Sequence, residues 1–501
     1  MGRAAFFCVV FLAVLVCQGN AWMDWLWRFN KSTVSDPDIT RNATELIRSK
    51  GYPCEEHFVT TADGFILGLQ RIPHGRHEVP AVPLPMNLTL PEGSPGNNQT
   101  SVSSLSNNQI LPNQTAPIPA PRKPVVFLQH GLLCSSTNWL TNLANQSFAY
   151  ILADAGFDVW LGNVRGNVYS KNHTHLSPDS EEFWDWSWDQ MAEYDLPAMV
   201  DYALQVSGQD QLYYVGHSQG SLMAFAGLSN NKELEKKIKM LFGLGPVATV
   251  GHMTSPLRYL STFVPELEFM LNLLGVNDFM PSSKITQWLA SDVCASSAEV
   301  WCENIVFVLS GFDEANMNKS RLPVYFSHSP AGTSVQDVIH FAQMVNSGQF
   351  QMYDYGSKEA NMVRYNQTSP PLYFPENFNT PTALYWGGED WLADPQDVKL
   401  LISRLQNLKG NVYIPEYNHL DFLWGLDAPI KVYQPIIQTI RQMEKYADVA
   451  QVLDQGAEDE EDEDDNEEED EEEDEEESFS GSEAIQEYRK KIKARQQKEN
   501  Y

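Results

Sequence analysis

Short apolar runs of strand length recur along the chain, and a glycine follows each of them closely. Between the runs at 157–161 and 212–215, residues 197–206 have a helical pattern with Pro197 in the first turn. Apolar runs that alternate with helical stretches predict a parallel sheet buried on both faces. The three runs are Val125–Leu128 before Gly131, Phe157–Leu161 before Gly162, and Leu212–Val215 before Gly216.

Two further runs, Thr382–Trp386 and Asn411–Ile414, continue the sheet after a long interval of helical and loop-like sequence. We expect this interval, residues 249–375, to form an inserted, mainly helical cap or lid. The core is then divided into residues 122–248 and residues 376–450. Residues 38–76 read as strand, turn and strand, and add an N-terminal part to the same domain. The predicted fold class is α/β with a mostly parallel central sheet.

The first 21 residues predict export from the cytosol. Arg3 precedes an apolar run that is too short to cross a bilayer, and small residues end at Ala21, so residues 1–21 read as a cleaved signal peptide. No other run is long enough for a transmembrane anchor. Nine Asn-x-Ser/Thr sequons after a signal peptide indicate a glycoprotein. They begin at Asn30, Asn42, Asn87, Asn98, Asn113, Asn145, Asn172, Asn318 and Asn366.

Two other segments cannot contribute to a core. Residues 79–121 hold nine prolines and a single charged residue, Glu92, which predicts a glycosylated surface loop. Residues 451–501 form an acidic tail with a basic end, in which all residues from Glu458 to Glu477 except Asn466 are acidic. Such a run repels itself, so we interpret it as an extended, solvated spacer.

The remaining composition describes a large globular protein. Hydrophobic residues make up 43% of the chain, which excludes wholesale disorder. The formal net charge is −32 and no long basic face occurs, so nucleic acid is not an expected partner. Trp184, Trp186 and Trp188 are interpreted as packing residues in preference to a lipid contact.

The strongest chemical signal is Gly216-His217-Ser218-Gln219-Gly220. It follows a predicted strand and precedes a predicted helix, which is the context of a G-x-S-x-G nucleophile elbow. The glycines permit a tight turn between strand and helix. An ordinary glycine turn is the alternative, and the strand–turn–helix context favours Ser218 as a nucleophile.

A serine nucleophile needs a base, and the base needs an acid to orient it. Asp390 follows the run that ends at Trp386, and His419 follows the run that ends at Ile414. We therefore predict Ser218, Asp390 and His419 at the carboxyl ends of consecutive strands, where open α/β sheets bind ligands. Four other carboxylates compete for the role of the acid, with helix capping or solvation as their ordinary roles: Glu389, Asp394, Asp397 and Asp421.

Acyl transfer also needs donors for the developing oxyanion. The main-chain N–H of Gln219, directly after the nucleophile, is one candidate. The N–H of Leu132, in the loop after the first core strand, is the second. His130 and His217 are interpreted as structural, His130 as a hydrogen-bonding strut beside that loop. No metal or organic cofactor is required, and no spacing typical of zinc ligands occurs.

Several motifs together resemble the animal acid lipases, a family that includes lysosomal and gastric lipases, from about residue 38 to residue 440. The motifs are His130-Gly131-Leu132-Leu133, Ser136-Thr137-Asn138-Trp139, Gly216-His217-Ser218-Gln219-Gly220, Ser329-Pro330-Ala331-Gly332-Thr333-Ser334, Gly387-Gly388-Glu389-Asp390-Trp391-Leu392-Ala393-Asp394 and Asn418-His419-Leu420-Asp421-Phe422. The long 79–121 loop and the acidic tail depart from this family.

The resemblance implies an α/β-hydrolase fold with a cap over the site. It implies hydrolysis of triacylglycerols, and of cholesteryl esters in the lysosomal branch. It implies that Ser218, Asp390 and His419 form the catalytic triad and that Leu132 and Gln219 are the oxyanion donors. It also implies a cap disulfide between Cys294 and Cys302, a close pair that an oxidising compartment would bridge; Cys54 and Cys134 are left free.

We therefore expect a serine lipase of the secretory pathway, destined for the lysosome or the exterior. Its partners are neutral lipids at lipid interfaces. A small-ester carboxylesterase or an acyltransferase on the same triad is the alternative among enzymes. A catalytically silent binding protein on this fold is the alternative outside enzymes.

Overall fold

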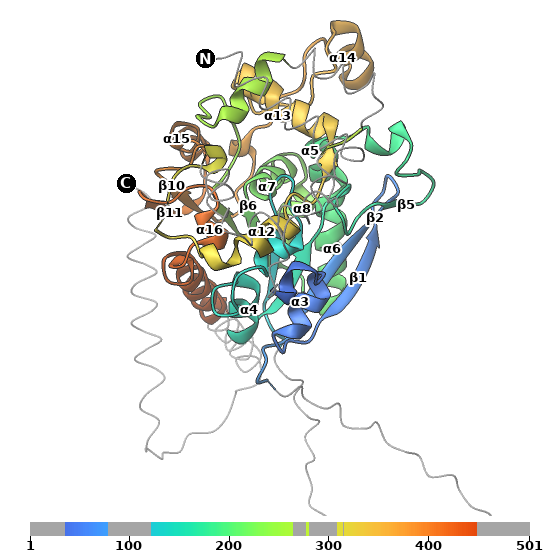
Figure 1. Ribbon diagram of the computed structural model, residues 1–501. Helices are drawn as coiled ribbons and strands as arrows, with labels where there is room; N and C mark the ends of the chain where they lie inside the picture. Colours follow the sequence, from blue (N-terminus) through green and yellow to red (C-terminus); the bar gives the residue numbers. More distant parts are fainter. Residues whose placement is uncertain (1–35, 79–121, 264–276, 280–307, 314, 448–501) are drawn as a thin grey trace, which may run out of the picture. The chain divides into compact units, whose positions relative to one another are not determined.

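The computed structural model describes residues 36–78, 122–263, 277–279, 308–313 and 315–447 (Figure 1). The described residues up to Arg441 form one compact unit, and every element below belongs to it. The predicted signal peptide, the 79–121 loop and the 451–501 tail lie outside the described residues. Within these ranges, no helix has the length and apolar character that a membrane span requires.

A central sheet organises the described part of the chain. Its strands run in the order β1-β2-β4-β3-β6-β7-β10-β11, and β5 pairs with β2. The strands from β4 to β11 are parallel, whereas β1 and β2 join as an antiparallel hairpin that pairs with β4. The strands are β1 (Glu55–Thr60), β2 (Phe65–Ile72), β3 (Val125–Gln129), β4 (Asp158–Gly162), β5 (Asn172–His173), β6 (Leu212–His217), β7 (Ile238–Leu244), β10 (Thr382–Gly387) and β11 (Leu408–Ile414).

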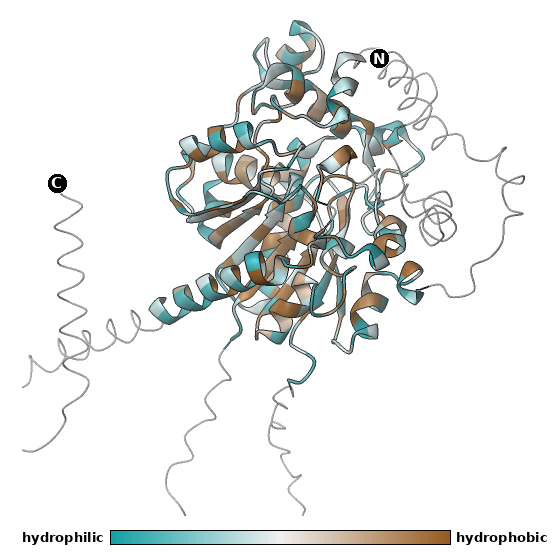
Figure 2. Ribbon diagram, turned by 60° about the vertical axis from the view of Figure 1, so that its left-hand side comes forward, coloured by the Kyte–Doolittle hydropathy of each residue, from teal (hydrophilic) through white to brown (hydrophobic). Residues whose placement is uncertain are grey.

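Helices cover the central, apolar strands of the sheet. In β3, β4, β6 and β10 every residue is buried, as expected of central parallel strands covered on both faces. Figure 2 shows hydrophobic residues concentrated in the sheet and on the helix faces turned toward it. The helices are α3 (Ala43–Ser49), α4 (Phe148–Asp154), α5 (Trp188–Gln190), α6 (Leu196–Ser207), α7 (Gln219–Asn230), α8 (Lys232–Lys237), α12 (Leu322–His328), α13 (Val335–Ser347), α14 (Lys358–Tyr365), α15 (Pro395–Arg404) and α16 (Asp421–Trp424).

The sequence pattern missed one central strand. The predicted strands correspond to β1, β2, β3, β4, β6, β10 and β11, but β7 lies between β6 and β10 and pairs with both. The prediction that Ser218 and Asp390 follow consecutive strands is therefore wrong. β7 escaped notice because it begins as Ile238-Lys239-Met240, directly after the charged helix α8, with no turn residue between them.

The described parts of residues 249–375 are mostly helical. They comprise the 3-10 helix η5 (Pro256–Phe263), α12, α13, α14 and a short ribbon of β8 (Asp278–Phe279) and β9 (Thr333–Ser334). In Figure 1, α13 and α14 lie together at the upper side of the fold. The side chains of Trp184, Trp186 and Trp188 are buried, which confirms their interpretation as packing residues.

Candidate active site

Ser218 lies at a sharp turn between β6 and α7. Its backbone has φ 55° and ψ −121°, a conformation that residues with a side chain rarely adopt. A Cβ on Gly220 would lie 2.5 Å from the carbonyl oxygen of Gln129, so only glycine allows β3 and the start of α7 to approach this closely. The turn therefore has the strained geometry of a nucleophile elbow.

Asp390 and His419 are hydrogen-bonded partners. Nδ1 of His419 lies 2.8 Å from Oδ2 of Asp390 and 3.1 Å from Oδ1. Both side chains are buried, and the loops that carry them follow β10 and β11. A carboxylate on Nδ1 fixes the imidazole so that Nε2 can accept a proton.

The turn at Ser218 and the predicted base, His419, meet through direct contacts. The imidazole rings of His217 and His419 have centroids 4.8 Å apart. The N–H of Ser218 donates to the carbonyl of Leu244, and a Cβ on the next residue, Gly245, would lie 3.1 Å from Nδ1 of His419. The structure thus brings Ser218, Asp390 and His419 to one edge of the sheet, although β7 separates their strands.

Three of the four rival carboxylates have other partners, and the fourth is exposed. Glu389 is exposed, and Asp394 caps α15 by accepting from the N–H of Gln396 at 2.8 Å. Asp397 accepts from the hydroxyl of Thr249 and from His252. Asp421 accepts from the N–H of Asn418 at 2.6 Å. These contacts favour Asp390 as the acid.

Two buried carboxyl groups, those of Asp394 and Asp421, lie near Asp390. Burial raises the pKa of Asp421 to about 9, with Asp313, Asp427 and Asp390 acting in the same direction and the hydrogen bond from Asn418 opposing it. Burial also raises the pKa of Asp394. Asp421 is therefore a neutral acid under acidic and neutral conditions, and it adds no negative charge beside Asp390.

The two predicted oxyanion donors lie next to Ser218. Gln219 is the first residue of α7, where a main-chain N–H has no acceptor within the helix. A Cβ on Gly131, the residue before Leu132, would lie 2.9 Å from Cβ of Ser218. Leu133 then adopts φ 59°, and its carbonyl accepts from the N–H of Ala331 at 2.7 Å.

His130 is confirmed as a hydrogen-bonding strut beside this loop. Its Nδ1–H donates to the carbonyl of Gly131 at 2.8 Å, and its Nε2 accepts from the N–H of Val164 and from Nδ2 of Asn167. Burial lowers the pKa of His130 to about 4, so the ring is neutral and keeps this pattern near pH 5. It therefore holds the loop and takes no part in proton transfer.

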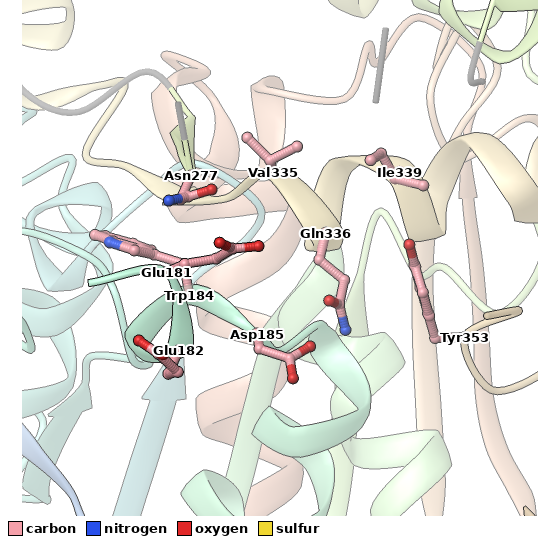
Figure 3. A pocket seen from close by; sticks show the side chains of 9 residues that line it. All are labelled: Glu181, Glu182, Trp184, Asp185, Asn277, Val335, Gln336, Ile339 and Tyr353. Atoms are coloured by element: carbon pink, nitrogen blue, oxygen red, sulfur yellow. The ribbon is translucent and has the colours of Figure 1, made fainter. Parts of the chain in front are cut away.

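A cavity of about 420 Å³ lies elsewhere, between the segment that precedes α5 and helix α13 (Figure 3). Glu181, Glu182 and Asp185 give it an acidic side, and apolar groups come from α13. None of Ser218, Asp390 and His419 lines it. The complete lining is Glu181, Glu182, Trp184, Asp185, Asn277, Val335, Gln336, Ile339 and Tyr353.

Four of the described sequons have exposed asparagines, at Asn42, Asn145, Asn172 and Asn366. Asn318 is half-buried, and its Nδ2 donates to Oε1 of Gln146 at 3.2 Å. The sequons at 30, 87, 98 and 113 lie outside the described residues.

Two of the four cysteines that follow the signal peptide can be described. Cys54 and Cys134 are free thiols, as expected. Cys294 and Cys302 lie outside the described residues, so their disulfide stays a prediction.

The sequence pattern missed a short segment, residues 310–312, that packs on the loops of the acid and the base. The carbonyl of Ser310 accepts from the N–H of Trp391 and from that of His419, at 3.3 Å each. Phe312 contacts Trp391, with ring centroids 5.3 Å apart. Main-chain contacts of this kind leave no signature in a sequence, because every residue has a carbonyl.

Known proteins and protein families are similar to this chain over most of its length. Residues 124–426 match the family described as "alpha/beta hydrolase fold", and residues 43–143 match "Partial alpha/beta-hydrolase lipase region". Human "Lysosomal acid lipase/cholesteryl ester hydrolase" is 44% identical over 435 residues, which cover 87% of this chain and 99% of that protein. Rat "Gastric triacylglycerol lipase" is 43% identical and covers 83% and 95%. Human "Lipase member K" is 45% identical and covers 81% and 92%.

Proposed function

The chain belongs to the animal acid lipase family of α/β-hydrolases and is a lipid ester hydrolase, and we propose that it works through an acyl-enzyme on Ser218. The observation that carries the mechanism is the buried hydrogen bond from His419 to Asp390 beside a strained serine turn. The acid lipases named above support the class of reaction.

The proposed reaction has two halves. Oγ of Ser218 attacks the ester carbonyl while Nε2 of His419 takes the hydroxyl proton and Asp390 stabilises the imidazolium. The N–H groups of Leu132 and Gln219 bind the oxyanion. The proton then passes to the departing alcohol, and water attacks the acyl-enzyme in the same way. Because proton and acyl group are handled by side chains and N–H groups, the steps need no cofactor.

We propose triacylglycerols, cholesteryl esters or both as substrates. The names of the relatives above include both ester classes. Residues 249–375 are proposed to form the cap through which a water-insoluble ester reaches Ser218. An acyltransferase or a small-ester esterase would use the same triad, so the products must be compared with and without an acceptor alcohol.

We also propose that the protein acts in the lysosomal lumen or outside the cell. Support comes from the apolar run after Arg3, from the sequons at exposed asparagines, and from the lysosomal and gastric relatives. His130 beside the Leu132 loop and Asp421 beside His419 are both neutral at pH 5, which fits a compartment of low pH.

The test is a substrate panel with Ser218→Ala as the matched inactive variant. Triolein, cholesteryl oleate and p-nitrophenyl butyrate are hydrolysed at pH 5 and pH 7.5. We expect the wild type to cleave a long-chain ester and to react with a fluorophosphonate at Ser218. The folded variant should lose both properties, with kcat lower by about 10⁴ or more. Undiminished turnover by folded Ser218→Ala would reject the mechanism, and fluorophosphonate inertness of the wild type would indicate a silent binding protein.

A further inference from the structure

The main chain of His419 is held from two sides. Its N–H donates to the carbonyl of Ser310 at 3.3 Å, and its carbonyl accepts from Nε2 of His217 at 2.9 Å. The side chain is held separately, through Nδ1 and Asp390. Ser310 belongs to the 249–375 region, and His217 belongs to the elbow, so segments distant in sequence meet at one residue.

The contact with His217 fixes the tautomer of that ring. A carbonyl oxygen can only accept, so Nε2 of His217 carries the proton and Nδ1 is the unprotonated nitrogen. Nδ1 has no hydrogen-bond partner among the described residues. Burying an imidazole nitrogen without a hydrogen-bond partner costs free energy of folding. A residue retained at this cost is expected to have a specific role, and the one hydrogen bond that the ring makes indicates what that role is.

The charge state of His217 suits a position beside the base. Burial lowers the pKa of His217 to about 3, and the neighbouring His419 acts in the same direction. His217 therefore stays neutral at pH 5 and keeps its Nε2–H donor. A charged ring whose centroid is 4.8 Å from that of His419 would instead oppose the imidazolium that forms during catalysis.

The contact with Ser310 depends on a glycine. Gly311 has φ 108°, and a Cβ on it would lie 1.8 Å from the carbonyl oxygen of Glu389 and 3.1 Å from Cβ of Asn418. The segment therefore lies against both the loop of the acid and the loop of the base. A side chain at position 311 would push it away from both.

We propose that His217 and Ser310 position the catalytic base by holding the carbonyl and the N–H of His419. The inference rests on the proposed function, since it takes His419 as the base. His217 does not touch substrate, so it is a positioning residue. A displacement of the base by about 1 Å costs on the order of 10²-fold in rate, and this sets the size of the expected effects.

The first experiment compares His217→Gln with His217→Met. The two side chains have similar length, but only glutamine keeps a donor at the position of Nε2. On p-nitrophenyl butyrate at pH 5, we expect His217→Met to lower kcat about 10- to 100-fold with KM within about twofold. His217→Gln should restore most of the rate. Equal kcat in the two folded variants, whether high or low, would overturn the role of the hydrogen bond.

The second experiment compares Gly311→Ala with Gly356→Ala. It remains informative even if the His217 variants fail to fold. Gly356 also has a positive φ, 81°, but a Cβ there meets nothing within 4 Å, so both variants carry backbone strain and only one displaces a neighbour. We expect a fall in kcat, and in the rate of fluorophosphonate labelling, for Gly311→Ala alone. Equal rates in the two variants would overturn the role of the Ser310 segment.

Turnover by His419→Ala distinguishes a failure of this inference from a failure of the proposed function. Near-normal turnover by folded His419→Ala would reject the triad itself. If His419→Ala is inactive while both comparisons show no difference, only the positioning inference fails.

Discussion

Replacing Asp390 by asparagine should inactivate the enzyme through the tautomer of His419. Oδ1 of Asp390 accepts from the N–H groups of Leu392 and Ala393, at 2.9 and 2.8 Å, and Oδ2 faces Nδ1 of His419 at 2.8 Å. Asparagine has one oxygen, and the two N–H donors hold it at the position of Oδ1. Its NH₂ group must then donate to Nδ1. The ring proton moves to Nε2, where it prevents acceptance of the proton from Ser218.

The size of the effect follows from the mechanism. An amide in place of the triad acid lowers kcat by about 10⁴, which is a loss of about 5 kcal/mol of transition-state stabilisation. The substitution preserves volume and does not change the oxyanion donors, so KM should stay within about twofold. Initial rates on p-nitrophenyl butyrate give kcat and KM, and circular dichroism with a thermal melt shows that the variant is folded.

Asp394→Asn is the matched control. Oδ1 of Asp394 accepts from the N–H of Gln396 at the start of α15, and asparagine caps a helix as well as aspartate does. Its kcat should remain close to that of the wild type. The reasoning is refuted if folded Asp390→Asn keeps kcat within tenfold of the wild type, or if Asp394→Asn loses more than Asp390→Asn.

Two further predictions concern buried charges away from the triad. Burial raises the pKa of Asp337 from 3.8 to about 7, so the stabilisation from its neutral form is complete below pH about 4 and is lost as the pH rises through 7. The Tm of Asp337→Asn relative to the wild type should therefore be higher at pH 8 than at pH 5, and an equal difference at both would contradict this. Arg165 is buried between Asp63 and Asp195, so Arg165→Met should lower the free energy of unfolding by about 3–5 kcal/mol in urea. The exposed Lys236→Met should leave the urea midpoint unchanged, and equal midpoints for the two variants would count against a structural role for Arg165.

The sequence located most of the sheet because central parallel strands are buried on both faces. β3, β4, β6 and β10 are therefore continuous apolar runs, which stand out in any chain. β7 is equally central, but it directly follows a charged helix and has Lys239 as its second residue, so its apolar pattern did not stand out from the sequence. Strand order could not be read from the sequence, because pairing is a long-range property of the fold.

The candidate side chains of the site left a clearer signal in the sequence than the contacts that hold them. Ser218, Asp390 and His419 each follow a strand, and chemistry restricts the residue types that can fill their roles. Ser310 acts through its carbonyl, which no residue type signals. The role of Gly311 became visible only through its 108° φ and its contact with Glu389.

The strained turn at Ser218 bears on the proposed base as well as on the proposed nucleophile. A backbone with φ 55° in a residue other than glycine costs on the order of 1–3 kcal/mol and persists only where surrounding contacts enforce it. Here the N–H of Ser218 donates to Leu244, and its carbonyl accepts from the hydroxyl of Ser221 at 2.6 Å. The preceding residue, His217, reaches the carbonyl of His419 from the same turn. A relaxed turn would therefore displace Ser218 and move His217 away from the carbonyl of His419 together, so the strained turn maintains both positions that the proposed mechanism needs.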